Sequence, residues 1–190
     1  TSLSKYRQSH WDLFHTLIRP EIPLSRYGWV ERIVKEVGAT SLLEIGTGTG
    51  ESALRMIEAA KTFAPANSIY YLGFDLFRQL TPEELSREFS KQPMVKGVVE
   101  ARLKHTGANI YLIPGDTKET IPNFTKTYSG GKYNFVFIDG GHSWETIQND
   151  WENIQPLLGE HAVVLFDDYY RDPPVYLHAG CQHLLDNGVG

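Results

Sequence analysis

A glycine-rich turn at 46–50 is the stretch of this sequence best suited to hold a ligand. It follows the apolar run 42–45 and precedes an amphipathic segment that opens near its end. Glycine has no Cβ, so backbone can come close to a ligand, and the free N–H groups of a following helix point to the same place. The candidate binding residues of this stretch are Gly46, Thr47, Gly48, Gly50 and Ser52.

An acidic residue sets this turn apart from a phosphate-binding loop. Glu44 comes just before the glycines, and no Lys or Arg lies in or beside them. A P-loop is excluded, because no Gly-Lys-Ser/Thr follows. Negative charge without a basic partner is not expected where a phosphate binds. We therefore expect the turn to bind a neutral or positively charged group.

Further acids follow the apolar segments that alternate with helical patterns along the chain. In an open parallel sheet, ligands bind beyond the carboxyl ends of the strands. Each acid taken alone has an ordinary explanation, since Asp is a good turn and N-cap residue. Acids at all five ends are harder to explain, because like charges repel. The residues concerned are Glu44, Asp75, Asp116, Asp139, Asp167 and Asp168.

These acids must be positioned by a parallel sheet. Near-continuous apolar strands that alternate with helices indicate a sheet covered on both faces, so we predict a Rossmann-like, doubly wound α/β fold with a mostly parallel sheet. The strands are expected at 42–46, 69–74, 109–113, 133–138 and 161–166. The helices are expected at 27–37, 51–61, 95–106, 117–121 and 143–155, with a helical insertion opened by Thr81.

One ligand fits the first group of acids. Asp75 ends the second strand, where an acid typically holds ribose hydroxyls. Asp116 is placed to hold or orient an adenine, and Glu44 to receive an amino group or a fixed water. Together they describe S-adenosylmethionine, an adenosyl ligand without phosphate and with a positive sulfonium. A nicotinamide cofactor fits less well, because its Gly-x-Gly-x-x-Gly spacing is absent and Asp75 lies too far along.

The second group of acids is suited to a metal ion. Asp139, Asp167 and Asp168 come from neighbouring strand ends, and their convergence is costly unless a cation neutralises them. An all-oxygen donor set favours Mg²⁺, or Ca²⁺ or Mn²⁺, over a soft metal. His142 follows Asp139 in Ile-Asp-Gly-Gly-His. It is either a general base, since His titrates near neutrality, or a solvent-facing residue at a helix start.

These motifs together resemble a known family. Leu-Glu-Ile-Gly-x-Gly-x-Gly, the Asp75 strand end, Gly-Asp-Thr at 115–117, Ile-Asp-Gly-Gly-His at 138–142 and Phe-Asp-Asp-Tyr at 166–169 are similar to class I S-adenosylmethionine-dependent methyltransferases. More narrowly, the chain resembles the metal-dependent O-methyltransferases of the macrocin O-methyltransferase and cephalosporin hydroxylase group. The resemblance covers about residues 27–175.

The resemblance implies roles for individual residues. Glu44, Gly46 and Gly48 line the methionine part of the cofactor, Asp75 the ribose and Asp116 the adenine side. Asp139, Asp167 and Asp168 match the metal-binding carboxylates, and Asp139 also borders the cofactor. His142 and Asp139 compete for the role of catalytic base. Such folds usually end with two more strands, whereas this sequence ends at Gly190, so we expect missing C-terminal strands or an atypical sheet edge.

The overall composition limits the class of protein to which this chain can belong. A chain of 190 residues with 41% hydrophobic and 22% charged residues is an ordinary globular chain. A net charge of -5 argues against nucleic-acid binding, and no apolar run approaches the roughly 20 residues that span a membrane. The single Cys181 suits a reducing compartment, and nothing near Thr1 resembles a signal peptide, so we expect a cytoplasmic protein.

We expect two parts in the chain. Residues 1–38 form an N-terminal helical segment with a helix at 3–18, which is a lid, a homodimer arm or simply a packed helix. Residues 39–190 form the S-adenosylmethionine-binding methyltransferase domain. An aromatic and basic loop, which either contacts the substrate or packs the last helix from about Pro174, contains Tyr169, Tyr170, Arg171 and Tyr176.

The expected activity is methyl transfer to a hydroxyl of a small molecule such as a sugar, a phenol or a secondary metabolite. Positioning of the acceptor oxygen supplies much of the acceleration, because the sulfonium is already a good electrophile. Two alternatives remain open at this stage. One is a non-catalytic S-adenosylmethionine-binding module, and the other is a nicotinamide-dependent oxidoreductase.

Overall fold

The computed structural model describes residues 25–88, 92–169, 181 and 184–185 of the chain. The predicted helix at 3–18, the loop residues Tyr170, Arg171 and Tyr176, and the predicted last helix from about Pro174 lie outside these residues. The division of the chain at residue 38 therefore stays a prediction.

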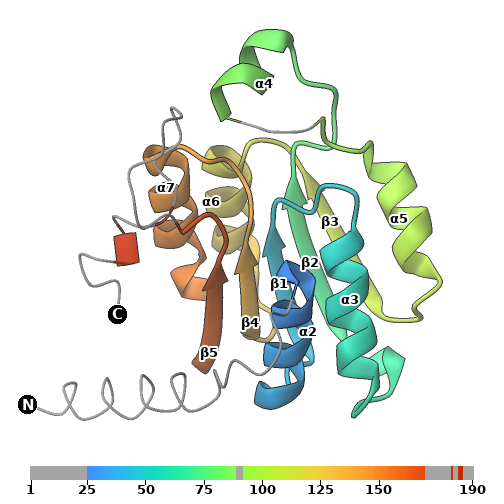
Figure 1. Cartoon of the computed structure of the whole chain (residues 1–190). Helices are drawn as coiled ribbons and strands as arrows, with labels where there is room; N and C mark the ends of the chain where they lie inside the picture. The colour runs from blue at the N-terminus through green and yellow to red at the C-terminus, as the bar shows by residue number, and fades with distance from the viewer. Residues whose placement is uncertain (1–24, 89–91, 170–180, 182–183, 186–190) are drawn as a thin grey trace, which may run out of the picture.

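Five strands form one parallel sheet in the order β3-β2-β1-β4-β5 (Figure 1). The strands are β1 (Ser41–Ile45), β2 (Tyr70–Asp75), β3 (Asn109–Pro114), β4 (Tyr133–Ile138) and β5 (Leu158–Phe166). The predicted doubly wound fold is confirmed. Since β1 pairs with both β2 and β4, the strand order reverses beside β1, and a crevice forms there at the carboxyl ends.

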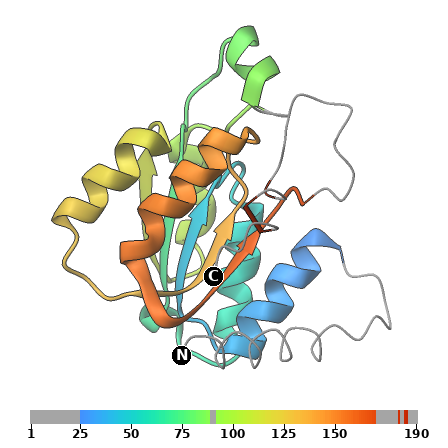
Figure 2. The same cartoon turned by 90° about the vertical axis from the view of Figure 1, so that its left-hand side faces the viewer.

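Helices cover both faces of the sheet, as the two cartoon views show (Figures 1 and 2). The helices are α2 (Arg26–Val37), α3 (Glu51–Lys61), α4 (Pro82–Glu88), α5 (Lys96–Lys104), α6 (Thr117–Thr127) and α7 (Trp144–Ile154), with short 3₁₀ turns at Ala66–Ser68 and Gln155–Leu157. Helices α2, α3 and α5 lie on one face, and α6 and α7 lie on the other.

The core divides into two layers because neighbouring strand residues point to opposite faces. Leu42 packs with Val30 of α2 and Met56 of α3, whereas the next residue, Leu43, packs with Ile121 of α6. All five are fully buried. The sheet is thus fixed from both sides, and its carboxyl edge becomes a rigid rim.

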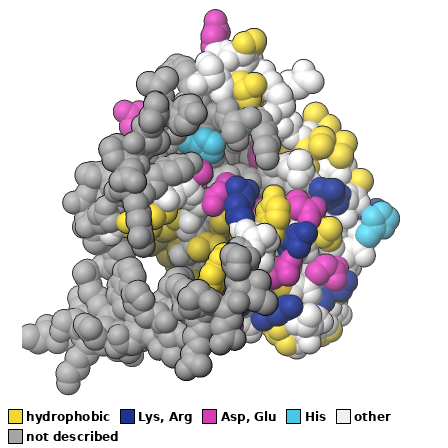
Figure 3. Space-filling model, in the orientation of Figure 1, with side chains coloured by type: hydrophobic (Ala, Val, Ile, Leu, Met, Phe, Trp, Pro, Cys, Tyr) yellow, Lys and Arg dark blue, Asp and Glu magenta, His cyan; other side chains and the backbone are white. Residues whose placement is uncertain are grey.

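The exposed face of α2 and α3 is rich in charge. Arg55 of α3 pairs with Glu31 of α2 and with Glu51 of its own helix, and Arg32 pairs with Glu36. Basic and acidic side chains accordingly lie side by side on this face (Figure 3). Such exposed pairs contribute little stability each, so the packing of the helices rests on their buried residues.

One helix is longer than predicted. The sequence predicts a short helix at 117–121, but α6 continues through Pro122 to Thr127, although proline lacks a backbone donor. Packing explains the difference: Phe124 contacts Phe74 edge to face, with ring centroids 5.6 Å apart, and stacks on Tyr128 at 4.7 Å. These contacts hold the helix beyond the proline.

Among the described residues, no helix has the length and hydropathy to cross a membrane.

Candidate active site

The glycine turn connects β1 to α3 and lies against the end of β4. Gly46 has φ +87°, which L side chains rarely adopt, and a Cβ there would lie 1.9 Å from the backbone oxygen of Asp139. The Gly46 N–H donates to the Phe74 oxygen at 2.9 Å, and the Asp139 N–H donates to the Ile45 oxygen at 2.8 Å. Only glycine fits at position 46, and its absence of a side chain brings the turn and the β4 end into contact.

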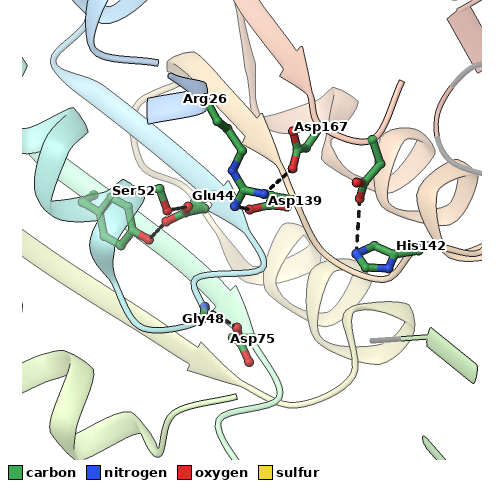
Figure 4. A network of polar contacts seen from close by, with 10 residues as sticks. Arg26, Glu44, Gly48, Ser52, Asp75, Asp139, His142 and Asp167 are labelled. Atoms are coloured by element: carbon green, nitrogen blue, oxygen red, sulfur yellow. Dashed lines mark hydrogen bonds and ion pairs between the residues drawn. The ribbon is translucent and has the colours of Figure 1, made fainter. Parts of the chain in front are cut away.

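Glu44 lies beneath this turn and is completely buried. Ser52 Oγ donates to one carboxylate oxygen, and Tyr71 Oη donates to the other (Figure 4). Burial raises the pKa of the Glu44 carboxyl to about 7, although the two hydrogen bonds oppose this shift. The sequence predicts an acid under the turn, without a basic partner, that receives an amino group or a fixed water. In the structure Glu44 lies beneath the turn and its partners are neutral hydroxyl groups, but it is not among the residues that line the cavity.

Asp75 and Asp116 are the acids at the next two strand ends. Asp75 Oδ2 accepts from the Gly48 N–H at 2.7 Å, and its Oδ1 accepts from the Phe77 N–H at 3.1 Å. Burial raises the pKa of Asp75, and these backbone donors lower it in part. Asp116 is the N-cap of α6 and accepts from the Lys118 N–H at 2.9 Å. Both residues line the cavity, so Asp116 caps its helix and also borders the cavity.

Three carboxylates meet beyond β4 and β5. Asp139, Asp167 and Asp168 each offer one oxygen, and these oxygens lie within 4.8 Å of one another. Burial and the neighbouring Asp167 raise the pKa of Asp139. Asp168 has φ +59°, a left-handed conformation that Asp tolerates better than most residues. An all-oxygen set of three partly buried acids fits a hard divalent cation.

Arg26 supplies a positive charge to this cluster. Its Nη1 donates to Asp167 Oδ2 at 2.6 Å, and its Nη2 donates to Asp139 Oδ2 (Figure 4). Arg26 is the first residue of α2, which Ser25 caps by accepting from the Gly28 N–H at 3.2 Å. The N-cap therefore fixes the start of the helix that delivers the guanidinium to the rim.

His142 lies on the loop between β4 and α7. Its Nε2 is 3.2 Å from Asp168 Oδ2, and both side chains are less than one fifth exposed. A carboxylate beside an imidazole orients the ring. The structure thus brings His142 next to the acid cluster, as the sequence predicts.

A cavity of about 560 Å³ joins these parts into one site. Its volume lies within the usual range for small-molecule sites. Of the residues predicted from the sequence, those that line it are Gly46, Thr47, Gly48, Ser52, Asp75, Asp116, Asp139, His142 and Asp168. Gly50 is the N-cap of α3, and Asp167 joins the site through its contact with Arg26. The glycine turn and the acid cluster therefore open onto the same space.

Three residues of this region were missed by the sequence interpretation. Arg26 belongs to no motif, and only the packing of α2 decides whether its side chain reaches the acid cluster. Tyr71 looks like an ordinary aromatic residue of a strand. Asp150 of α7 is 1% exposed, and its Oδ2 has no hydrogen-bond partner in the described part of the chain. Its pKa rises to about 7 through burial, with opposing hydrogen bonds from Thr117 and Asn149. The one sequence signal for Asp150 is that this acid lies on the apolar side of the helical pattern, where an acid is unexpected.

The fold and the site define a class I methyltransferase-like α/β protein. A family model described as a methyltransferase domain matches residues 43–169, which is more than half of the chain. The chain therefore belongs to this methyltransferase family, and the nicotinamide-dependent alternative is not supported. No curated protein matches the chain significantly in sequence.

Solved methyltransferases share the fold. NovP, an O-methyltransferase, has a TM-score of 0.64 at 19% identity, with 85% of this chain and 69% of that chain covered. CalS11, a calicheamicin methyltransferase, has a TM-score of 0.55 at 18% identity, with 84% and 76% covered. The SAH-bound methyltransferase PaMTH1 of Podospora anserina has a TM-score of 0.51 at 17% identity, with 82% and 58% covered. The chain thus spans less than two thirds of the length of PaMTH1.

Proposed function

We propose that this protein transfers the methyl group of S-adenosylmethionine to a hydroxyl oxygen of a small molecule, such as a sugar, a phenol or a secondary metabolite, with Mg²⁺ or another hard divalent cation at the acid cluster. One observation carries the proposal: the glycine turn and two carboxylates of the acid cluster, Asp139 and Asp168, line the same cavity. NovP is named an O-methyltransferase and CalS11 a TDP-rhamnose 3'-O-methyltransferase, which supports a hydroxyl acceptor.

The cofactor half of the site needs no phosphate-binding group. Gly46, Thr47 and Gly48 present backbone to the ligand, and Ser52 borders the same space. Asp75 is placed to accept ribose hydroxyls, and Asp116 to orient the adenine. Glu44 supports the turn from below through its contacts with Ser52 and Tyr71, without direct exposure to the cavity.

The acceptor half depends on the residues at the ends of β4 and β5. Asp139, Asp167 and Asp168 would hold the cation, which supplies charge neutralisation and lowers the pKa of a coordinated hydroxyl. Proton removal then falls to His142 or Asp139. The position of His142 beside Asp168 favours the histidine, because Asp139 would itself be a ligand of the cation. Tyr169 is 46% exposed next to this cluster and is available to an acceptor.

The test is transfer of a labelled methyl group to a panel of sugars and phenols. We expect transfer to stop with EDTA, to return with added Mg²⁺, and to be lost in Asp167→Ala. Glu160→Ala is the matched control, because Glu160 lies exposed on the same strand and outside the cavity. Transfer that survives both EDTA and Asp167→Ala would remove the cation from the mechanism. Cofactor binding without transfer to any acceptor would instead favour a non-catalytic binding module.

A further inference from the structure

The acid cluster already contains one cation from the protein itself. The two terminal nitrogens of Arg26 contact two of the three carboxylates that a metal would use, Asp167 and Asp139. A divalent cation requires these oxygens at about 2.0–2.6 Å, where the guanidinium nitrogens now make hydrogen bonds. Arg26 and a metal ion would therefore compete for the same carboxylates, because two cations held this close together also repel each other.

We propose that Arg26 is a built-in competitor of the divalent cation: it holds the acid cluster when no metal is bound, and metal binding displaces it. This inference rests on the proposed metal site, but it concerns a residue to which neither the family match nor the sequence motifs assign a role. The exchange replaces one positive charge at the three carboxylates by two, which matches their total negative charge more closely.

Arg26 is held weakly enough to be displaced. Its side chain is 46% exposed, whereas Asp139 and Asp167 are 12% and 20% exposed. Ion pairs with one solvated partner contribute little net free energy, whereas a metal ion is held by all three carboxylates. The guanidinium thus neutralises the carboxylates in the empty site without preventing metal binding.

The exchange is coupled to the entrance of the cavity. Arg26 begins α2, and both Arg26 and Tyr27 line the cavity with Asp139 and His142. The Arg26 guanidinium also lies over the Tyr27 ring, 5.3 Å from its centroid. When the metal displaces Arg26, the first turn of α2 loses its attachment to β4 and β5. Metal loading therefore loosens the rim at which an acceptor enters, and coupling of this kind is reciprocal.

The test compares Mn²⁺ binding by the full chain and its variants in calorimetry, without cofactor or acceptor. Arg26→Gln removes the charge and keeps an unbranched polar side chain, and we expect it to bind Mn²⁺ about 3- to 10-fold more tightly, because no intramolecular competitor remains. Arg32→Gln is the matched control: it removes an arginine of the same helix that pairs with Glu36 instead, and its affinity should equal that of the wild type. Asp167→Asn should lose binding.

A second variant guards against a folding defect. Arg26→Lys keeps the positive charge but presents a single ammonium, which cannot hold two carboxylates in the same fork. We expect its Mn²⁺ affinity to lie between those of the wild type and Arg26→Gln. If Arg26→Gln does not fold, the Mn²⁺ affinity of Arg26→Lys alone tests the proposal. An affinity of Arg26→Lys at or below that of the wild type contradicts it.

Hydrogen exchange provides a readout that a merely structural role of Arg26 would not change. The Gly28 N–H donates to Ser25 Oγ, and the Trp29 N–H donates to the Ser25 oxygen at 3.1 Å. Added Mn²⁺ should speed exchange at these amides in the wild type. In Arg26→Gln exchange should be fast from the start and indifferent to Mn²⁺.

The possible failures are distinguishable. Equal Mn²⁺ affinity in the wild type and Arg26→Gln, with loss in Asp167→Asn, would overturn the competition and leave the metal site intact. Absence of Mn²⁺ binding in every variant would overturn the competition together with the metal dependence. A separate titration with S-adenosylmethionine tests the cofactor half of the proposed function, which none of these outcomes affects.

Discussion

The buried carboxylate of Asp150 should make this protein less stable as pH rises. Its Oδ2 has no hydrogen-bond partner in the described part of the chain, and its pKa rises from 3.8 to about 7. A group whose pKa is higher in the folded state binds more protons there than in the unfolded state. Its contribution to stability therefore falls as pH rises from about 4 to about 7, and the loss is complete above that range.

The substitution Asp150→Asn keeps the shape and removes the charge, so it should stabilise the protein at high pH. The pKa of Asp150 is higher by about 3 in the folded state, and a pKa difference of 1 corresponds to about 1.4 kcal/mol. The stabilisation by Asp150→Asn at pH 8 therefore has an upper limit of about 4 kcal/mol. At pH 5 most of the folded wild type is protonated at this site. The same relation then gives a stabilisation by Asp150→Asn of about 2 kcal/mol. The new amide also lacks a full set of partners, but that cost does not change with pH.

The assay is urea denaturation followed by circular dichroism at pH 5, 6.5 and 8. We expect the free energy of unfolding of Asp150→Asn, relative to the wild type, to rise by about 2 kcal/mol between pH 5 and pH 8. Glu152→Gln serves as the control, because Glu152 is an exposed acid of the same helix that accepts from Gln148. A difference between Asp150→Asn and the wild type that stays constant with pH would refute the reasoning.

Two further predictions concern the cofactor half of the site. Gly46→Ala combines a left-handed φ with a clash against the Asp139 backbone, so it should cost more than about 4 kcal/mol of stability in urea denaturation, whereas Gly48→Ala, with no atom closer than 4.0 Å, should cost only about 1–2 kcal/mol. Similar losses in both variants would contradict the close approach. Asp75→Asn removes a charged acceptor from the proposed ribose site and should weaken S-adenosylmethionine binding at least about 10-fold in calorimetry, with unchanged affinity as the contrary result.

The sheet and the acidic rim could be predicted from the sequence because both depend on local patterns. Each strand is an apolar run, and parallel strands place the residues that follow them at one edge. Asp75, Asp116, Asp139 and His142 therefore line one cavity as expected. Their positions follow from chain direction alone, which a sequence shows directly.

Partners could not be predicted, because they depend on tertiary packing. Nothing around Arg26 distinguishes it from an exposed arginine, and only the placement of α2 against the sheet brings it to Asp139 and Asp167. The sequence shows that no basic residue lies beside Glu44, but it does not show the hydroxyl partner Tyr71, which comes from the next strand, 27 residues later. The length of α6 was underestimated for the same reason, because aromatic packing by Phe124 outweighs the local effect of Pro122.

A single backbone contact makes the two halves of the site one unit. Gly46 lies so close to the Asp139 backbone that no side chain fits between them, and Asp139 donates its N–H to the Ile45 oxygen. The turn that would hold the cofactor and the carboxylate that would hold the cation are thus fixed relative to each other by the sheet. Methyl transfer requires this, because the acceptor oxygen must lie in line with the methyl group, and an error of about 1 Å can cost about 100-fold in rate. In the proposed function, the glycine at position 46 therefore serves alignment as well as cofactor binding.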